Sequence, residues 1–510
     1  LNNIPFKVEG QETYNRSSNH NKKPVLGTVA SLMVLMIAFI IFQILRNKQR
    51  QKREKEQLSR SQGTATFADD QVLKQYKRSK NGLYIGAKEL YFQDQANILT
   101  VAGARSGKGT NLIIPNLLGA SNYHGSWVVI DPKGEIAAIT AAYQQSVGRK
   151  VIILDPFKEL KTVAEQNPSF SHLKTLNYGR FNPLDALDPN SDELTDDADV
   201  IAGMLVPKAS GEDSHWNDRA RSMISGLLLH LKTSQPEKDQ TFFKLYEWLR
   251  LPKVEWVMLL QGMQRSEALY GIIRAQGNEI LSLMETSEKE FGSVISTARR
   301  YTDIFKSPAL IRSLATSDFA VDRIAQEQMT LYLILPSKKL ESHRTWLRLC
   351  IKMCLTAVMQ NKGHRVTFLM DEFHSLGRLD IIEKAMGRLP GFNITLWPIL
   401  QDLNQLKSLY KDSWETFVAN SRVRHFFGTG DNFTAEYVSR RIGDTTILTP
   451  QNEGYSANKR PLMTPDEVIK SKDIITFIDN HPTAKLEKMP YYEWEDLKGL
   501  ARPNPYYQGD

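Results

Sequence analysis

Two short segments of the chain carry residue types that together act on phosphate. Residues 102–110, Ala-Gly-Ala-Arg-Ser-Gly-Lys-Gly-Thr, are mostly small, include Lys108, and follow an apolar stretch. In such a loop, backbone N–H groups and the dipole of the following helix attract phosphate, and the lysine reaches the outer phosphates of a nucleotide. The second segment, residues 366–372, is an apolar run that ends in Asp371 and Glu372.

The two carboxylates of the second segment suit the other half of a phosphoryl-transfer site. We expect Asp371 to hold Mg²⁺ and Glu372 to polarise the attacking water. The chain is therefore predicted to be a nucleoside triphosphatase that uses ATP and Mg²⁺. The loop residues expected to bind the nucleotide are Ala104, Arg105, Ser106, Gly107, Lys108, Gly109 and Thr110, and Lys108 is also expected to act in catalysis.

The loop departs from the general pattern G-x-x-x-x-G-K-[ST], whose final hydroxyl binds Mg²⁺. Ala102 stands at the first glycine position and Gly109 at the hydroxyl position, while Thr110 follows one residue later. We expect Thr110 to supply the hydroxyl. Taken alone, the loop is also compatible with an ordinary Gly/Ser turn, and the strand ending in Asp-Glu with a helix cap. Their order along the chain, each after an apolar run, favours the nucleotide site.

Three more polar residues follow predicted strands. Asp131 and Glu135 come just after the strand at 127–130, where open α/β sheets bind ligands, but Asp-Pro-Lys-Gly is also an ordinary turn. Gln401 follows the strand at 393–400. It is expected either to sense the γ-phosphate or to make a structural hydrogen bond at the strand end.

Four arginines surround the last predicted strand, at 423–427. They are Arg422, Arg424, Arg440 and Arg441. One of them is a candidate arginine finger for a neighbouring subunit, and a surface ion pair is the alternative for each. Arg424 is the favoured candidate, because its strand is expected to end near the rim of the sheet.

The positive charge of the chain is concentrated near its beginning. Residues 46 to 60 carry seven Lys or Arg against Glu54 and Glu56, whereas the whole chain has a net charge of +8. Bulk charge is therefore not evidence for DNA binding. Residues 24–45 precede this cluster and contain no charged residue. About 20 apolar residues span a bilayer as a helix, so we expect a transmembrane helix there, with residues 46–510 in the cytoplasm.

Cys350 and Cys354 are the only cysteines. Their spacing of four residues places both on one face of a helix, and no Cys or His partners stand at metal-ligand spacing. We expect them to pack in the core of a protein kept in a reducing compartment.

Short apolar strands alternate with helical segments on either side of a long helical region. The first group of strands is expected at 97–101, 127–130 and 151–154, and the second at 329–335, 366–370, 393–400 and 423–428. Between them, residues from about 190 to 320 show helical periodicity. This pattern predicts an α/β domain with a buried parallel sheet, interrupted by an inserted all-α domain.

Several ordered segments together resemble the type IV secretion coupling proteins, the TraG/TraD-like conjugation ATPases. The resemblance runs from Gly63 to about Tyr492. It rests on residues 63–65, 106–109, 114–118, 131–135, 181–184, 371–373, 401–403, 460–468 and 488–492.

The resemblance implies a RecA-like P-loop nucleotide-binding domain with an inserted all-α domain, and hexamers with ATP sites between subunits. It also implies that the protein couples a relaxase bound to single-stranded DNA to a secretion channel in the bacterial inner membrane. Such proteins usually have two transmembrane helices, and the sequence shows one. The expected divisions are 1–23 (periplasmic), 24–45 (transmembrane), 46–62 (stalk), 63–186 and 326–510 (nucleotide-binding), and 187–325 (all-α).

Two other functions remain compatible with the sequence. One is a receptor or scaffold that recruits protein effectors under nucleotide control without moving DNA. The other is a membrane-anchored translocase of double-stranded DNA, which would share the ATPase core but not the segments around 131–135 and 460–468.

Overall fold

The computed structural model describes residues 25–77, 82–87, 89–120, 123–208, 211, 213–451 and 454–506. They fall into two compact units. One contains the described residues up to Thr64 together with Asp444–Arg460. The other contains Ala65–Gly443 and the described residues from Pro461 onward. The predicted periplasmic segment 1–23 lies outside the described residues.

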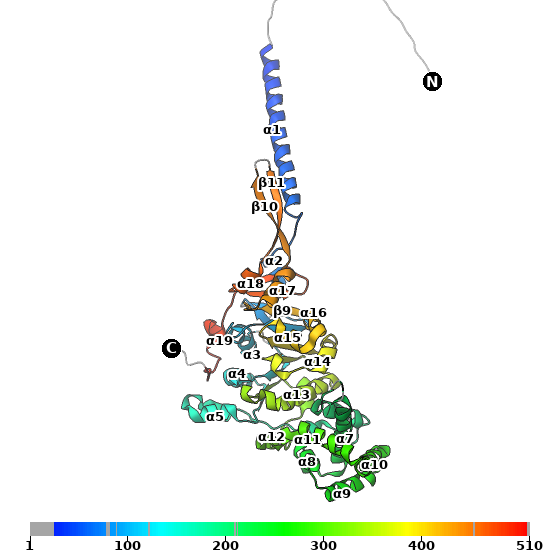
Figure 1. Cartoon of the computed structure of the whole chain (residues 1–510). Coiled ribbons are helices and arrows are strands. Elements are labelled where there is room, and N and C mark those ends of the chain that lie inside the picture. Colours follow the sequence, from blue (N-terminus) through cyan, green and yellow to red (C-terminus); the bar gives the residue numbers. More distant parts are fainter. Residues whose placement is uncertain are drawn as a thin grey trace, which may run out of the picture. The chain divides into compact units, whose positions relative to one another are not determined.

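The first unit consists of a long helix and a hairpin. Helix α1 (Val25–Leu58) packs beside the antiparallel strands β10 (Asp444–Gln451) and β11 (Gly454–Pro461) (Figure 1). Lys55 Nζ lies 3.5 Å from the hydroxyl of Tyr455, and Gly63 N–H donates to Thr446 Oγ1 at 3.0 Å. The hairpin therefore belongs with the helix, although most of the chain separates them in sequence.

Helix α1 carries exposed large apolar side chains from Met33 to Leu45. It covers nearly all of the range predicted to cross a membrane, 24–45, and continues without a break into the basic segment. Within the part of the chain that the structure describes, no helix is both long enough and apolar enough to span a bilayer.

The second unit is built on a nine-stranded sheet. Neighbouring strands are parallel from β9 to β5, and β12 and β13 extend the β9 edge in antiparallel fashion. In sheet order the strands are β13 (Ala484–Leu486), β12 (Ile474–Ile478), β9 (Ser421–Phe426), β3 (Asn97–Val101), β8 (Ile394–Leu400), β7 (Val366–Met370), β4 (Ser126–Ile130), β6 (Met329–Leu333) and β5 (Lys150–Leu154).

The central strands are buried on both faces, which explains their nearly continuous apolar sequences. The predicted α/β class with a parallel central sheet is confirmed. Helices that pack around the sheet include α3 (Ile114–Leu117), α4 (Glu135–Ser146), α13 (Ser337–Gln360), α15 (Leu403–Tyr410), α16 (Trp414–Ala419) and α17 (Asn432–Ile442). A separate small hairpin pairs β1 (Leu83–Gly86) with β2 (Leu90–Phe92).

The described elements between β5 and β6 are all helical. The longer ones are α5 (Glu159–Gln166), α6 (Leu194–Leu205), α7 (Asp213–Ser234), α9 (Lys253–Gln264), α10 (Ile272–Thr286) and α11 (Glu288–Thr302). The apolar side chains of α6, α7, α9, α10 and α11 join one continuous core with one face of the sheet, whereas those of α5 pack in the core on the other face. The division into a separate all-α domain at 187–325 stays a prediction.

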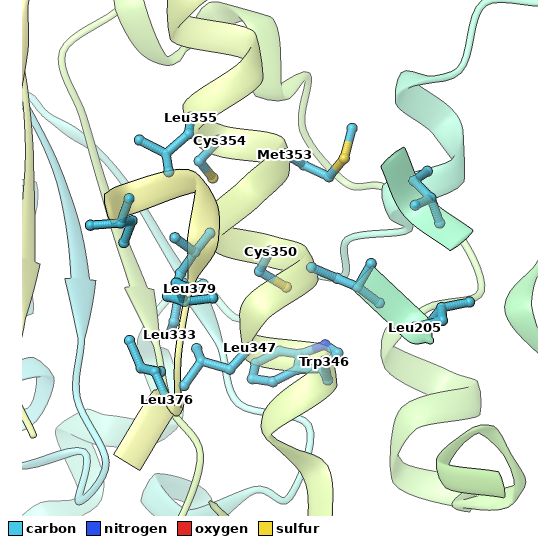
Figure 2. Packing of buried hydrophobic residues seen from close by; sticks show 14 of the residues in the cluster. Leu205, Leu333, Trp346, Leu347, Cys350, Met353, Cys354, Leu355, Leu376 and Leu379 are labelled. Atoms are coloured by element: carbon cyan, nitrogen blue, oxygen red, sulfur yellow. The ribbon is translucent and has the colours of Figure 1, made fainter. Parts of the chain in front are cut away.

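Helix α13 supports the sheet through one apolar face. Figure 2 shows Trp346, Cys350 and Cys354 on this helix, with Leu205 of α6 on one side and Leu379 on the other. Both cysteines are free and fully buried, which confirms that they pack in the core.

The hairpin leaves and rejoins the second unit at two adjacent points. Helix α17 ends at Ile442, and the next residue, Gly443, has a left-handed φ of 93°. Its carbonyl oxygen accepts a hydrogen bond of 2.9 Å from the backbone N–H of Leu462. The two ends of the segment 444–461 are therefore tied together.

Candidate functional site

The small-residue loop follows β3 directly and turns into a helix. Residues 109–113 form one turn of π-helix that continues into α3. Gly107 has φ 93°, and a Cβ atom there would lie 2.7 Å from Asn111 Nδ2. Asn111 in turn donates to the Gly107 carbonyl oxygen at 2.7 Å. Glycine is needed at 107 both for the backbone conformation and for this close approach.

Lys108 points from the loop toward the end of β7. Its Nζ lies 2.7 Å from Oδ1 of Asp371 and 3.6 Å from Oε1 of Glu372. Burial favours a lower pKa for Lys108, but the two carboxylates outweigh it and raise the pKa overall. Three residues predicted from two distant segments therefore form one charged cluster.

Gln401 joins the same cluster from the strand in between. Strand β8 lies between β3 and β7, and Gln401 follows its last residue. Its Nε2 donates to Oε2 of Glu372 at 3.2 Å. Glu372 itself has a left-handed φ of 54°, a conformation that costs energy in a non-glycine residue and is often found at functional sites. The side chain of Gln401 thus contacts the residue expected to activate water.

The hydroxyl groups of the loop differ in how they are bonded. Ser106 Oγ is buried and has no hydrogen-bond partner among the described residues. Thr110 Oγ1 donates to the Gly107 carbonyl oxygen at 3.2 Å. A Cβ atom added to Gly109 would meet no atom within 4 Å. An unbonded buried hydroxyl beside a lysine fits a phosphate group, because buried polar atoms normally have partners.

Asp131 caps a helix next to the cluster. It is 1% exposed, and its Oδ2 accepts a hydrogen bond of 2.8 Å from the N–H of Ala137 in α4. Burial raises the pKa of Asp131 to about 7, and the Asp371 charge adds to the effect, although the Ala137 bond opposes it. Its visible contacts are those of a structural cap, and a role in binding nucleotide stays a prediction.

Glu135 is covered by the C-terminal segment. Asn504 Nδ2 donates to Glu135 Oε1 at 2.5 Å, and the hydroxyl of Tyr506 donates to the Lys133 carbonyl oxygen at 2.5 Å. The sequence did not predict a role for these C-terminal residues. They carry no local motif, and only the fold brings them to the end of β4.

Arg424 does not occupy the position expected for an arginine finger. Strand β9 lies inside the sheet, where Arg424 pairs with Leu99 of β3 and Phe477 of β12. The side chain is 5% exposed, and its Nη2 donates to the Asp479 carbonyl oxygen at 3.0 Å. The expectation that its strand ends near the rim is wrong, because β12 and β13 cover that edge.

The other arginines of this region differ in their contacts. Arg422 forms ion pairs with Asp94 and Asp479. Arg440 and Arg441 are exposed on α17. The choice among the four as a finger stays a prediction.

No group of three or more His, Cys, Asp or Glu side chains forms a metal cage within the described residues. Mg²⁺ commonly uses one or two carboxylates together with substrate phosphates. Asp371 beside the phosphate-type loop fits that mode of binding.

Comparison with known proteins gives a consistent result. The family described as "Type IV secretory system Conjugative DNA transfer" matches residues 47–506. The conjugal transfer protein TraG of Escherichia coli is 27% identical over 439 residues, which cover 76% of this chain and 65% of that protein. Protein VirD4 of Agrobacterium fabrum is 25% identical to this chain, and the match covers 60% of the VirD4 protein. The chain thus spans somewhat less than two thirds of the length of these relatives.

A solved structure shows the same fold. The unbound form of the bacterial conjugative coupling protein TrwBdeltaN70 superposes with a TM-score of 0.63 at 16% identity, covering 83% of this chain and 93% of that one. TrwB has also been solved with ADP and Mg²⁺ (TM-score 0.61, 17% identity, covering 84% of this chain and 96% of that one). With the family match covering most of the sequence, this chain belongs to the type IV secretory system conjugative DNA-transfer family.

Proposed function

We propose that this chain is a coupling ATPase of a conjugative type IV secretion system. It binds ATP and Mg²⁺ in a RecA-like P-loop site, recruits a relaxase–DNA complex, and drives transfer of the single strand by ATP hydrolysis. The observation that carries this proposal is the contact of Lys108 with both Asp371 and Glu372. Family membership adds the DNA-transfer context.

Each residue of the cluster has a distinct task in this proposal. Lys108, Ser106 and the backbone N–H groups of 104–110 would hold the phosphates, and Asp371 with Thr110 would hold Mg²⁺. When bound, ATP supplies the phosphoryl group and Mg²⁺ neutralises its charge. Glu372 orients water and accepts its proton. Gln401 donates a hydrogen bond to Glu372 and so sets the direction of that carboxylate.

The proposal also covers where the protein is located and how its subunits assemble. We propose association with the bacterial inner membrane through the exposed apolar side chains 33–45 of α1. We also propose hexamers with shared ATP sites, in contact with secretion-channel components. Membrane fractionation of the full chain and of a chain lacking residues 1–45 tests the membrane association. Sedimentation with ATP tests the hexamer. A full chain that stays in the soluble fraction contradicts the membrane proposal.

The central test is ATP hydrolysis by the full chain with and without single-stranded DNA. Strong stimulation by DNA supports the motor. Hydrolysis that is indifferent to DNA supports the rival function, a nucleotide-controlled receptor or scaffold for protein effectors. Absence of hydrolysis in both conditions contradicts the ATPase assignment.

A further inference from the structure

We propose that a basic groove along helix α13 binds the phosphate groups of single-stranded DNA. This inference rests on the proposed function for its substrate class. The groove consists of two hollows of about 580 Å³ and 450 Å³. Both are lined by Asp199, Gly203, Arg348 and Asp380, so they are adjacent, and we call them together the α13 groove.

Basic side chains dominate the lining of the α13 groove. They include Arg221, Arg344, Arg348, Lys352, Arg378 and Arg388, whereas the acidic side chains are Asp199 and Asp380. Some of the positive charge is already paired, because Arg378 contacts Asp380 and Glu383. Arg221 is paired as well, because its Nη1 donates to Asp218 Oδ1 at 2.8 Å. Among the described residues, Arg344, Arg348, Lys352 and Arg388 form no ion pair and are available to an anion.

The unpaired charge is concentrated on α13. Arg344, Arg348 and Lys352 are spaced by four residues, so they line one face of the helix. Like charges at this spacing repel each other. Among the described residues, neither Arg344 nor Arg348 forms a direct ion pair with a carboxylate, so the charge of Asp380 near Arg348 offsets the repulsion only in part.

Buried guanidinium nitrogens make the need for an anion more specific. Arg348 Nε and Arg221 Nη2 are buried and have no hydrogen-bond partner in the described part of the chain. Burial, together with the nearby charge of Arg344, lowers the pKa of Arg348. A bound anion would satisfy these donors and offset the repulsion, because unmade buried hydrogen bonds are costly.

The chemistry of the groove favours the phosphodiester backbone. Arginine binds phosphate with two parallel hydrogen bonds. The described residues that line the groove include no aromatic side chain on which a base could stack. Contacts to phosphate alone carry no sequence information. The groove is therefore suited to a strand of any sequence.

The groove and the nucleotide site share one short segment of chain. Glu372 is followed by the 3₁₀ turn η8 (Phe373–Leu376), and then by Gly377 and Arg378 of the groove wall. A rearrangement of Glu372 therefore acts on a segment that also carries Arg378, a side chain of the groove wall.

The test compares the full chain in detergent with the variant R344Q/R348Q. Binding of a labelled mixed-sequence single strand is measured by fluorescence anisotropy over a series of salt concentrations. The affinity of the variant should fall about tenfold or more. Its salt slope should be smaller by about 1.4, because each phosphate contact on a single strand contributes ~0.7. R344K/R348K should retain most of the binding, and R312Q, which alters an exposed arginine of α12 (Pro308–Ser313), should match the wild type.

Each outcome decides the proposal. Unchanged DNA binding by R344Q/R348Q, with a melting temperature like that of the wild type, overturns it. Two measurements test other ligands of the groove. Calorimetry measures binding of inorganic phosphate, and competition against the labelled strand measures binding of a polyglutamate peptide. If the double substitution abolishes phosphate or peptide binding but not DNA binding, the DNA assignment is wrong. If the wild type binds DNA but does not hydrolyse ATP, the proposed motor function is wrong. The proposal that the α13 groove binds DNA is not affected by that result.

Discussion

The Nζ atom of Lys108 lies 2.7 Å from Oδ1 of Asp371, although the two residues come from the loop after β3 and the end of β7. Lysine is the group expected to hold the phosphates, and aspartate is the group expected to hold the metal. Phosphate and Asp371 must therefore compete for the same ammonium group. Binding of nucleotide should be accompanied by a rearrangement of this ion pair.

Replacing Lys108 by alanine should lower ATP turnover by about 10²-fold or more, because one positioned donor to a transferring phosphoryl group contributes that much. The fold should persist, since Lys108 makes its ion pairs at the sheet edge and not in the apolar core. Steady-state hydrolysis and circular dichroism measure the two effects. K174A, which alters an exposed lysine, is the control. Normal turnover by K108A would show that the loop does not bind phosphate.

Replacing Glu372 by glutamine should separate binding from hydrolysis. The amide keeps the size of the side chain but cannot accept the proton of water, so ATP should bind and persist. Equilibrium binding of a fluorescent ATP analogue and single-turnover hydrolysis measure these two steps. Q401A should slow hydrolysis less, because it removes only the donor to Glu372. If E372Q no longer binds nucleotide, Glu372 has a structural role.

Replacing Asp131 by asparagine should change how stability depends on pH. Burial raises the pKa of Asp131 to about 7 from an ordinary value of 3.8. Between about pH 4 and 7 the folded protein holds a proton that the unfolded chain has lost, so the stability of the wild type falls as pH rises through this window. D131N has no such proton. The free energy of unfolding of the wild type relative to D131N should therefore decline from pH 4 to 7 and then level off.

Chemical denaturation at several pH values measures this difference. D496N, which alters an exposed aspartate, should follow the wild-type profile. Parallel profiles for wild type and D131N would show that Asp131 stays ionised in the folded protein.

Replacing Arg424 by alanine should destabilise the second unit by about 1–3 kcal/mol, through loss of a buried hydrogen bond and of side-chain packing. Thermal unfolding measures the effect, and R440A, at an exposed site, should change stability by less than about 0.5 kcal/mol. A stable R424A protein without ATPase activity would return Arg424 to the role of finger. Mixing it with E372Q subunits would then restore activity if the arginine acts between subunits.

Much of the sheet could be predicted because parallel strands buried on both faces have continuous apolar sequences. The antiparallel strand β12 was missed although Ile474–Ile478 has the same apolar pattern. Its pairing with β9 depends on where the chain returns after the β10–β11 hairpin, and local sequence does not encode that. This one omission also explains the wrong placement of Arg424.

The candidate site was predictable where residues follow parallel strands, because the carboxyl ends of such strands meet at one edge of the sheet. Lys108, Glu372 and Gln401 belong to this class. The α13 groove does not. Arg344 and Arg348 alternate with core residues along one helix, and their lack of carboxylate partners depends on how α6 and residues 377–388 pack beside it.

The hydrogen bond between Leu462 N–H and the Gly443 carbonyl oxygen holds the two ends of the segment 444–461 together. We therefore expect that this segment can be exchanged as a unit. The hairpin lies in the connection between β9 and β12, and it adds no strand to the nine-stranded sheet. Segments of this kind tolerate insertion and exchange. We expect related chains to differ in the length of this segment while keeping the same nine-stranded sheet.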